Sequence, residues 1–274
     1  MPSLDSLAET QTHRIVIYGP PKSGKTFSIG KLAESHTIHY LSLENGYTTF
    51  FNPACVLPEF RKNIIIHKIK DLPEAPVVAT TIDSLFRNGE ANLCEEHGRI
   101  NCSSCKSAKK EFYNLDLTKL GPKDILVLDS ITQWTSSINF FLNKDNPDKK
   151  FEFEDWRKVG LYLDRSLSRI QLLENTNVIC ISHEGESESV AGVDKVVPAA
   201  GTRNFSRNSA RFFDGVYYCY QENKKHKMAS SSTHSNAIQT GDRLSFDVTQ
   251  YPDTRTALYA LFNPSERDAL KKGA

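Results

Sequence analysis

The sequence lacks a surplus of either charge, since 34 lysines and arginines stand against 33 aspartates and glutamates. This balance excludes a body that binds nucleic acid by bulk charge, so any such binding must come from a local basic patch. The sequence also has no apolar run near the roughly 20 residues that span a bilayer. Residues 1–13 have no basic stretch followed by an apolar one and do not resemble a secretory signal. We therefore expect a cytoplasmic protein with no membrane partner.

Cysteine is scarce as well, with six in 274 residues, which is too few for a disulfide scaffold. Half of them are crowded together, at Cys94, Cys102 and Cys105. With 39% hydrophobic and 24% charged residues, the chain has the composition of a globular protein with a sizeable core. The cysteine pattern indicates a reducing compartment and a metal site rather than disulfides.

Short β-branched runs alternate with helical patterns along the chain. This alternation predicts an α/β fold with a mostly parallel central sheet flanked by helices. Residues 91–110 interrupt it as an insertion, and residues 184–204 and 222–242 have the composition of mobile loops. The predicted strands are 13–18, 37–43, 63–69, 124–129, 177–182, 216–220 and 243–248, and the predicted helices are 26–35, 75–88, 153–174 and a weakly packed one in the last ten residues.

A phosphate-binding loop follows the first predicted strand. Residues 19–26 match the pattern G-x-x-x-x-G-K-[ST] without a mismatch, with a strand before and a helix after. Backbone N–H groups of such a loop cradle phosphate oxygens, the lysine reaches the β and γ phosphates, and the threonine hydroxyl ligates Mg²⁺. The alternative is a chance glycine loop. The predicted nucleotide-binding residues here are Gly19, Pro20, Pro21, Lys22, Ser23, Gly24, Lys25, Thr26 and Phe27.

Three polar residues end other predicted strands at the same sheet edge. Asp129 ends a buried strand and is expected to hold Mg²⁺ together with Thr26. Glu44 ends the strand after the loop helix and is the candidate that activates the attacking water, with Lys25 as the second catalytic residue. His183 is a candidate sensor of the γ-phosphate. The alternatives are a capping aspartate, a solvated loop glutamate and a strand-end histidine with no role.

The crowded cysteines form the second motif. Cys94, His97, Cys102 and Cys105 place three thiols and an imidazole within twelve residues, a spacing suited to tetrahedral Zn²⁺. Because protein side chains would fill all four coordination positions of the ion, the site would be structural. Metal binding would supply the folding energy of an insertion that has few apolar residues. Free thiols beside an unrelated histidine and an iron–sulfur cluster are the alternatives.

A basic stretch lies beyond the strand that ends near His183. Arg203, Arg207 and Arg211 are spaced by four and would line one face if the segment is helical, with phenylalanines among them. Arginines interleaved with aromatic rings suit single-stranded nucleic acid, whereas a solvated amphipathic helix is the alternative.

Taken in this order, GPPKSGKT, LSLENG, LVLDS and VICISHE resemble the RecA-type ATPase core over residues 13–260. Within that superfamily the chain most resembles the phage nucleotide-binding proteins of the Sak-type single-strand annealing group. The resemblance implies Walker A residues at Lys25 and Thr26, a Walker B aspartate at Asp129, a catalytic glutamate at Glu44 and a γ-phosphate sensor at His183.

The resemblance also implies that residues 184–204 are the mobile DNA-binding loop. Arg211 and Phe212 take the places of residues that couple nucleotide to a neighbouring subunit, and Arg255 is the nearest match to a residue that reaches a neighbour's nucleotide. The sequence departs from the family at His183, where glutamine is usual, and in the cysteine insertion. It also has no room before residue 14 for the N-terminal helix and linker strand by which classical recombinases polymerise.

These observations predict one ATPase domain over residues 1–262, a zinc-binding loop over 91–110 within it and a polar tail over 263–274. The predicted function is an Mg²⁺-dependent, DNA-stimulated ATPase of recombination or strand annealing. The expected cofactors are ATP, Mg²⁺ and structural Zn²⁺, and the expected partners are single-stranded DNA and further copies of the chain. A regulatory ATPase switch and a replication accessory module acting through protein partners are the alternatives.

Overall fold

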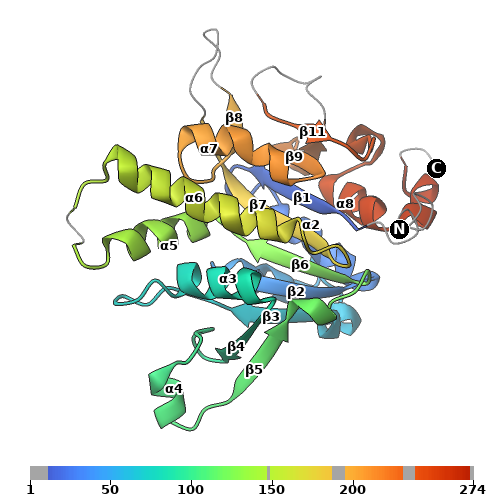
Figure 1. The fold of residues 1–274 in the computed structure, drawn as a ribbon. Coiled ribbons are helices and arrows are strands. Elements are labelled where there is room, and N and C mark those ends of the chain that lie inside the picture. Colours follow the sequence, from blue (N-terminus) through green and yellow to red (C-terminus); the bar gives the residue numbers. More distant parts are fainter. Residues whose placement is uncertain (1–11, 147–148, 187–194, 231–237, 272–274) are drawn as a thin grey trace, which may run out of the picture.

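The computed structural model describes residues 12–146, 149–186, 195–230 and 238–271. A twisted sheet crosses the molecule, with helices against both of its faces (Figure 1). Its strands are β1 (Arg14–Gly19), β2 (Thr37–Ser42), β3 (Ile64–Lys68), β6 (Asp124–Asp129), β7 (Asn177–Glu186), β8 (Val196–Pro198), β9 (Gly215–Glu222), β10 (Lys225–Ala229) and β11 (Gly241–Asp242).

The order of strands in the sheet decides which loops meet. The order is β10-β9-β1-β7-β6-β2-β3, and all strands from β9 to β3 run parallel. Strands β10 and β11 pair antiparallel with β9, and β8 pairs antiparallel with the end of β7. Because parallel strands end at one edge, the loops after β1, β2, β6 and β7 gather there. The predicted, mostly parallel central sheet is confirmed.

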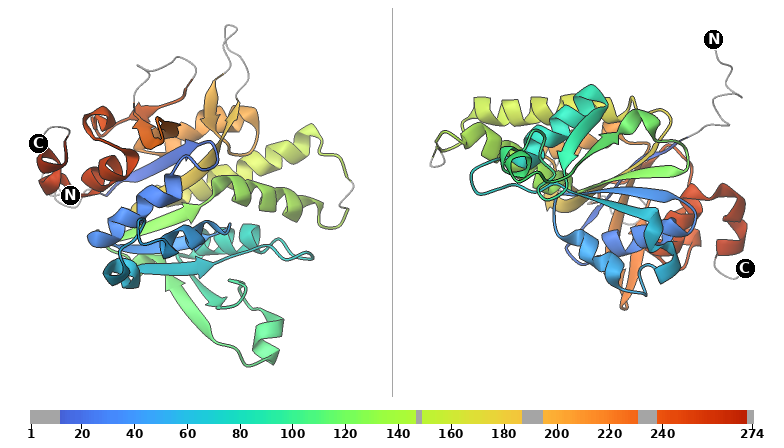
Figure 2. Two further views of the ribbon diagram at one scale, coloured as in Figure 1. Left: turned by 180° about the vertical axis from the view of Figure 1, so that it is seen from behind. Right: turned by 90° about the horizontal axis from the view of Figure 1, so that it is seen from below.

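Two hydrophobic cores fill the space between the sheet and its helices. Strand residues alternate between them, so that Val16 and Tyr18 of β1 face one core while Ile15 and Ile17 face the other. The turned views show the two helical layers on opposite sides of the sheet (Figure 2). One layer contains α3 (Val77–Asn88), α5 (Ile131–Asn143), α6 (Phe153–Ile170) and α7 (Arg203–Asn208), and the other contains α2 (Lys25–Ile29) and α8 (Thr254–Phe262).

A small hairpin stands apart from the main sheet. Strands β4 (Glu90–Cys94) and β5 (Phe112–Asp116) pair with each other, and α4 (Ser103–Ser107) lies between them in the sequence. Figure 1 shows the hairpin projecting beside β3. We call residues 90–116 the Cys/His module. The module is longer than the predicted insertion, 91–110, because β4 begins at Glu90 and β5 ends at Asp116.

The structure corrects two predicted elements. The segment 243–248 is not a strand. The backbone N–H groups of Leu244 and Phe246 donate to the Asp242 carboxylate, so they are not available to pair with a neighbouring strand. Residues 222–242 are not all loop, since β10 lies within them, although 231–237 fall outside the described residues.

Three further segments differ from expectation. The helix predicted over 26–35 is α2 followed by a 3₁₀ turn at Gly30–Glu34. The loop predicted over 184–204 contains paired strand residues on both sides of 187–194, which lie outside the described residues. The C-terminal segment forms two 3₁₀ turns, Pro264–Glu266 and Asp268–Leu270, rather than one helix.

Candidate functional site

A cleft of about 330 Å³ opens at the carboxyl edge of the sheet. We call it the P-loop cleft. It brings together side chains that are far apart in the sequence, because the parallel strands that carry them end side by side. The residues that line it are Pro21, Lys22, Ser23, Gly24, Lys25, Thr26, Phe27, Glu44, Gly46, Thr49, Asp129, Ile181, His183 and His226.

The Lys25 ammonium points back into the loop that carries it. Its Nζ donates to the backbone oxygens of Gly19 and Pro20, at 2.8 Å each, and to Ser23 Oγ at 3.3 Å. The side chain is buried, and burial lowers the pKa of Lys25. This buried cation within the loop has the position and chemistry required to bind phosphate oxygens.

Thr26 and Asp129 meet as the sequence predicts. Thr26 Oγ1 donates to Asp129 Oδ2 at 3.3 Å, and the Tyr40 hydroxyl donates to the same oxygen. Asp129 is only 5% exposed, and burial raises its pKa to about 6 despite these hydrogen bonds. A hydroxyl and a carboxylate at this separation are hard oxygen ligands of the type that Mg²⁺ prefers, so these residues fit the ion.

Glu44 is held between two partners at the mouth of the cleft. Ser130 Oγ donates to Glu44 Oε1, and His183 Nε2 lies 3.7 Å from that oxygen. The His183 contact lowers the pKa of Glu44, with help from Ser130 and against the effect of burial. An ionised glutamate that is one-third exposed can accept a hydrogen bond from a water molecule and orient it.

Sequence reasoning missed Tyr40, Ser130 and His226. Ser130 had a signal, because a serine directly before an apolar run is a helix cap, and its Oγ does accept from Gln133 N at 3.1 Å at the start of α5. Tyr40 and His226 had none. The contact of the buried Tyr40 with Asp129 and the place of His226 in the cleft depend on how β2 and β10 are arranged in the sheet.

The four residues predicted to bind zinc converge in the Cys/His module. His97 Nδ1 lies 3.2 Å from Cys105 Sγ, 3.6 Å from Cys102 Sγ and 3.9 Å from Cys94 Sγ. All four ligand atoms lie within 4.8 Å of one another. Ligands around a tetrahedral zinc ion are separated by about 3.5–3.8 Å, so the arrangement fits Zn²⁺.

The charge state of the thiols also favours a cation there. A hydrogen bond from the backbone N–H of Cys105 lowers the pKa of the Cys102 thiol to about 7. Burial beside the other thiols raises the pKa of the Cys105 thiol to about 12. A second negative charge in this cluster is therefore unfavourable unless a metal ion compensates it.

Gly98 attaches the module to the sheet. Its φ is +60°, and a Cβ on it would lie 2.0 Å from the backbone oxygen of Lys68 at the end of β3. Thr81 Oγ1 on α3 also donates to the Gly98 oxygen at 3.3 Å. The turn after His97 therefore requires glycine for both its conformation and its close packing.

The residues predicted for DNA or a subunit interface do not form one helical row, although Arg203 and Arg211 line a common groove. Helix α7 ends at Asn208 and a 3₁₀ turn, Ser209–Phe212, follows, so Arg203, Arg207 and Arg211 do not share one helical face. Arg211 pairs with Asp164 of α6. Phe212 is 5% exposed and lies in the core, where a surface contact cannot reach it.

Arg255 is bound to its own chain. It donates to the backbone oxygens of Ala54 and Cys55, at 2.7 and 2.9 Å, and its guanidinium lies over the Phe27 ring. In the isolated chain it therefore supports α2 and the 54–55 turn instead of projecting toward a neighbour.

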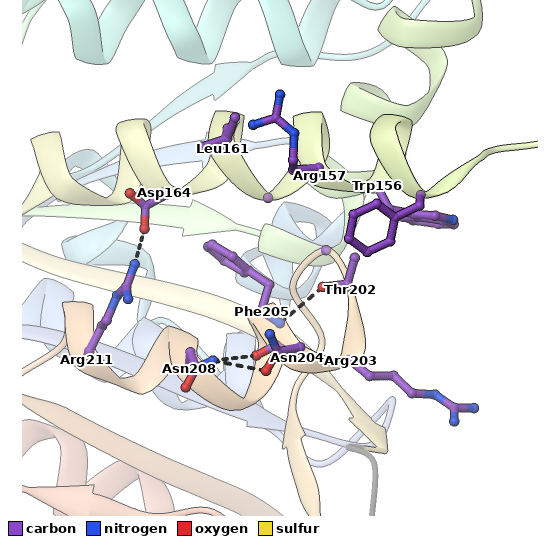
Figure 3. Close-up of a pocket in the computed structure, with 13 residues that line it drawn as sticks. Trp156, Arg157, Leu161, Asp164, Thr202, Arg203, Asn204, Phe205, Asn208 and Arg211 are labelled. Atoms are coloured by element: carbon purple, nitrogen blue, oxygen red, sulfur yellow. Dashed lines mark hydrogen bonds and ion pairs between the residues drawn. The ribbon is translucent and has the colours of Figure 1, made fainter.

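A second, larger hollow lies between α6 and α7 (Figure 3). This groove of about 820 Å³, which we call the α6–α7 groove, is lined by Trp156 and Arg157 of α6 and by Arg203 and Phe205 of α7. Phe153 is 86% exposed at the start of α6, and Trp156 is 38% exposed. Arg203 forms no ion pair among the residues that the structure describes. Arginines and exposed aromatic rings thus share one groove.

Comparisons with known proteins identify the family of the chain. None of the curated proteins matches. Solved structures similar to the chain include a prototypical ATPase from the type III secretion system of pathogenic bacteria, with 15% identity, a TM-score of 0.43 and coverage of 90% of this chain and 63% of that one.

Two others are an ATP synthase subunit, NeqB, from Nanoarcheaum equitans and the ATPase EscN from enteropathogenic E. coli, solved with its central stalk EscO. NeqB shares 12% identity at a TM-score of 0.43, and the match covers 94% of this chain and 59% of that one. EscN shares 13% identity at a TM-score of 0.42, and the match covers 95% of this chain and 54% of that one. The chain therefore spans less than two thirds of each of these structures.

In the part of the chain that the structure describes, every helix is too short or too polar to cross a membrane. The AAA domain family matches residues 11–244, which is most of the chain and includes the whole P-loop cleft. With its phosphate-binding loop at the end of β1 and its acidic residue at the end of β6, the chain belongs to the AAA domain family of P-loop ATPases.

Proposed function

We propose that the protein is a Mg²⁺-dependent ATPase, related to the Sak-type annealing proteins, that acts on single-stranded DNA in recombination or annealing. The observation that carries this proposal is the position of the α6–α7 groove, which is joined to the P-loop cleft by β7 and β8. Nucleotide binding follows from the family, whereas hydrolysis and the DNA partner are proposed here.

In the cleft, the loop amides and Lys25 bind the phosphates. Thr26 and Asp129 would hold Mg²⁺, with Tyr40 fixing the Asp129 carboxylate, and the ion would neutralise charge at the phosphates. Glu44 orients the water that attacks the γ-phosphate, and Ser130 and His183 keep Glu44 ionised and in place.

The groove suits a single strand because it offers two kinds of contact at once. The exposed rings of Phe153 and Trp156 can stack on bases without regard to sequence. Arg203 supplies a cation that is not neutralised by a partner among the described residues, whereas Arg157, on the α6 side of the groove, is paired with Glu154. This local patch satisfies the requirement set by the near-zero net charge of the chain.

Hydrogen bonds connect the two sites. The backbone oxygen of His183 accepts from Ala199 N at 2.8 Å, and Thr132 Oγ1 accepts from His183 N at 3.0 Å. Only a few residues separate Ala199 from Arg203 at the start of α7. A change at His183 when the γ-phosphate is cleaved can therefore shift the α7 wall of the groove.

The Cys/His module is proposed to hold one structural zinc ion per chain. Copies of the chain are proposed to assemble when DNA or nucleotide is bound. Neither proposal requires the module to take part in ATP hydrolysis, because its ligands belong to a hairpin outside the main sheet.

The test is ATP turnover with and without single-stranded DNA at low salt, with Lys25→Ala as the blank. Strand affinity is measured in parallel for the wild type, for Trp156→Ala and for Leu172→Ala, a control for the loss of an exposed apolar side chain. We expect DNA to raise turnover and Trp156→Ala to weaken strand binding about tenfold, as loss of one stacked base would do, while Leu172→Ala leaves it unchanged.

Other outcomes redirect the proposal. Turnover that persists in Lys25→Ala contradicts the assignment of the phosphate-binding loop. Turnover that ignores DNA, with no strand binding in any nucleotide state, leaves a regulatory ATPase or an accessory module whose partner is a protein.

A further inference from the structure

His226 lies over the phosphate-binding loop although it is distant from it in the sequence. Strand β10 pairs antiparallel with β9, and this pairing sets His226 opposite Gln221. The imidazole lines the P-loop cleft, and its ring centroid is 6.0 Å from that of Phe27. The histidine therefore belongs to the nucleotide site by position, although no role has been assigned to it so far.

The contact with Gly24 is close enough to constrain both residues. Gly24 has a φ of +89°, and a Cβ on it would lie 2.4 Å from the imidazole Cγ and 2.6 Å from Nδ1. Only glycine allows the loop backbone and the ring to approach this closely. The ring is thus held against the backbone that would cradle phosphate.

The His226 ring nitrogen that faces the loop lacks a partner. His226 Nδ1 is buried and has no hydrogen bond to any residue that the structure describes. Buried polar atoms are normally hydrogen-bonded, and leaving one unpaired costs free energy. A phosphate cradled by the adjacent loop would supply the missing partner.

The order of strands tells which end of a nucleotide His226 faces. Asp129 is the last residue of β6, Glu44 follows β2 and His183 lies near the end of β7, and these three strands are all on one side of β1. His226 comes from β10, on the other side of β1. The first group is assigned to Mg²⁺ and the γ-phosphate, so the opposite side of β1, where His226 lies, is left for the α-phosphate and ribose of a nucleotide.

We propose that His226 is a nucleotide-positioning residue whose imidazole hydrogen-bonds the α-phosphate. The proposal rests on nucleotide binding in the P-loop cleft but not on hydrolysis or on a DNA partner. It assigns β10 a role that a mobile loop could not have, since the pairing with β9 presents the ring at a fixed place.

Two variants separate hydrogen bonding from packing. His226→Phe keeps a ring of similar size and removes the polar nitrogens, whereas His226→Gln restores an amide N–H. ATP and ADP affinities are measured by calorimetry for both variants and the wild type, with melting temperatures as the control for folding. We expect His226→Phe to weaken ATP and ADP equally, by about tenfold, and His226→Gln to stay within about threefold of the wild type.

Each other result has a distinct meaning. Unchanged affinity in His226→Phe overturns the proposal, and so does a loss confined to ATP, because that would place the contact at the γ-phosphate. Equal losses in both variants would show a packing role only. A wild type that binds neither nucleotide would instead contradict the function proposed for the cleft.

Discussion

The P-loop cleft and the Cys/His module are assembled in opposite ways. The cleft unites residues from Pro21 to His226, and its geometry depends on the order of parallel strands. The module takes its four ligands from Cys94 to Cys105, within one hairpin. A site made of residues that are close in the sequence can therefore be predicted from their spacing, whereas a site assembled by the order of strands can be predicted only in part.

They also differ in what stabilises them. Two hydrophobic cores pack against the sheet that carries the cleft. The cluster at the ligands contains only Cys94, Cys102 and Cys105, with Phe112 packed against it. Leu93 and Leu115 of the module's strands join one of the two cores, so the strands are held by apolar packing. We expect metal to matter only around the four candidate ligands, where few apolar side chains pack.

The largest expected effect is on turnover in the cleft. Glu44→Gln removes the carboxylate that orients water while keeping a side chain that can contact Ser130. We expect ATP turnover to fall about 10²- to 10⁴-fold and ATP affinity to change little. Steady-state kinetics and calorimetry measure the two quantities, and Glu59→Gln, at an exposed position, is the control. Persistent hydrolysis would place the water-activating residue elsewhere.

The converse change breaks the module and spares the cleft. Cys102→Ser removes one ligand, so we expect the bound zinc to drop from about one per chain to nearly none and protease cleavage to appear within residues 94–112. ATP turnover should stay near the wild-type value. Elemental analysis and limited proteolysis measure these effects, with Ser103→Ala as a neighbouring control. If metal-replete wild type contains no zinc, the metal assignment is wrong.

A smaller effect concerns the buried charge of the cleft. The pKa of Asp129 is raised to about 6, above its ordinary value of 3.8, so ionisation of this carboxyl disfavours the folded state. The stability that protonated Asp129 contributes is fully present below pH 4 and is lost as the pH rises through 6. Asp129→Asn should remove a cost of up to about 3 kcal/mol at pH 7.5. We expect the melting temperature without nucleotide or Mg²⁺ to rise by several degrees at pH 7.5, with little gain at pH 4. A lower melting temperature at pH 7.5 would contradict this account.

The smallest effect lies where the module meets the sheet. His67 on β3 contacts Tyr113 on β5 and His39 on β2, at 3.2 and 3.4 Å. Burial lowers the pKa of His67 from 6.5 to about 4, so the stability that neutral His67 contributes is present above pH 6.5 and is lost as the pH falls through 4.

His67→Phe should therefore make the free energy of unfolding less dependent on pH in the acidic range. We expect the slope between pH 6.5 and 4 to decrease by up to about 1.4 kcal/mol per pH unit, which corresponds to one proton. Part of the pH dependence should remain in this variant, because the pKa of His36 is also lowered to about 4. Urea unfolding at several pH values measures it, and an unchanged slope would show that His67 does not take up that proton.

Much of both sites follows from short-range pattern. The loop at 19–26, the acidic strand end at Asp129 and the spacing of the four metal ligands are local features, because each depends on a few consecutive residues whose chemistry leaves little choice. The parallel sheet also follows, since buried β-branched strands that alternate with helices have few other ways to pack.

Other features depended on tertiary structure. The buried Tyr40 reaches Asp129 and His226 lines the cleft because β2 and β10 occupy particular places in the sheet. Phe212 lies in the core because the helix before it ends early. Residues 243–248 have a strand-like composition, yet the Asp242 side chain takes their backbone donors. Local sequence sets which chemical groups are present in each segment. Which distant side chains share a site follows from the order of strands and from competition for hydrogen bonds, and both depend on the whole chain.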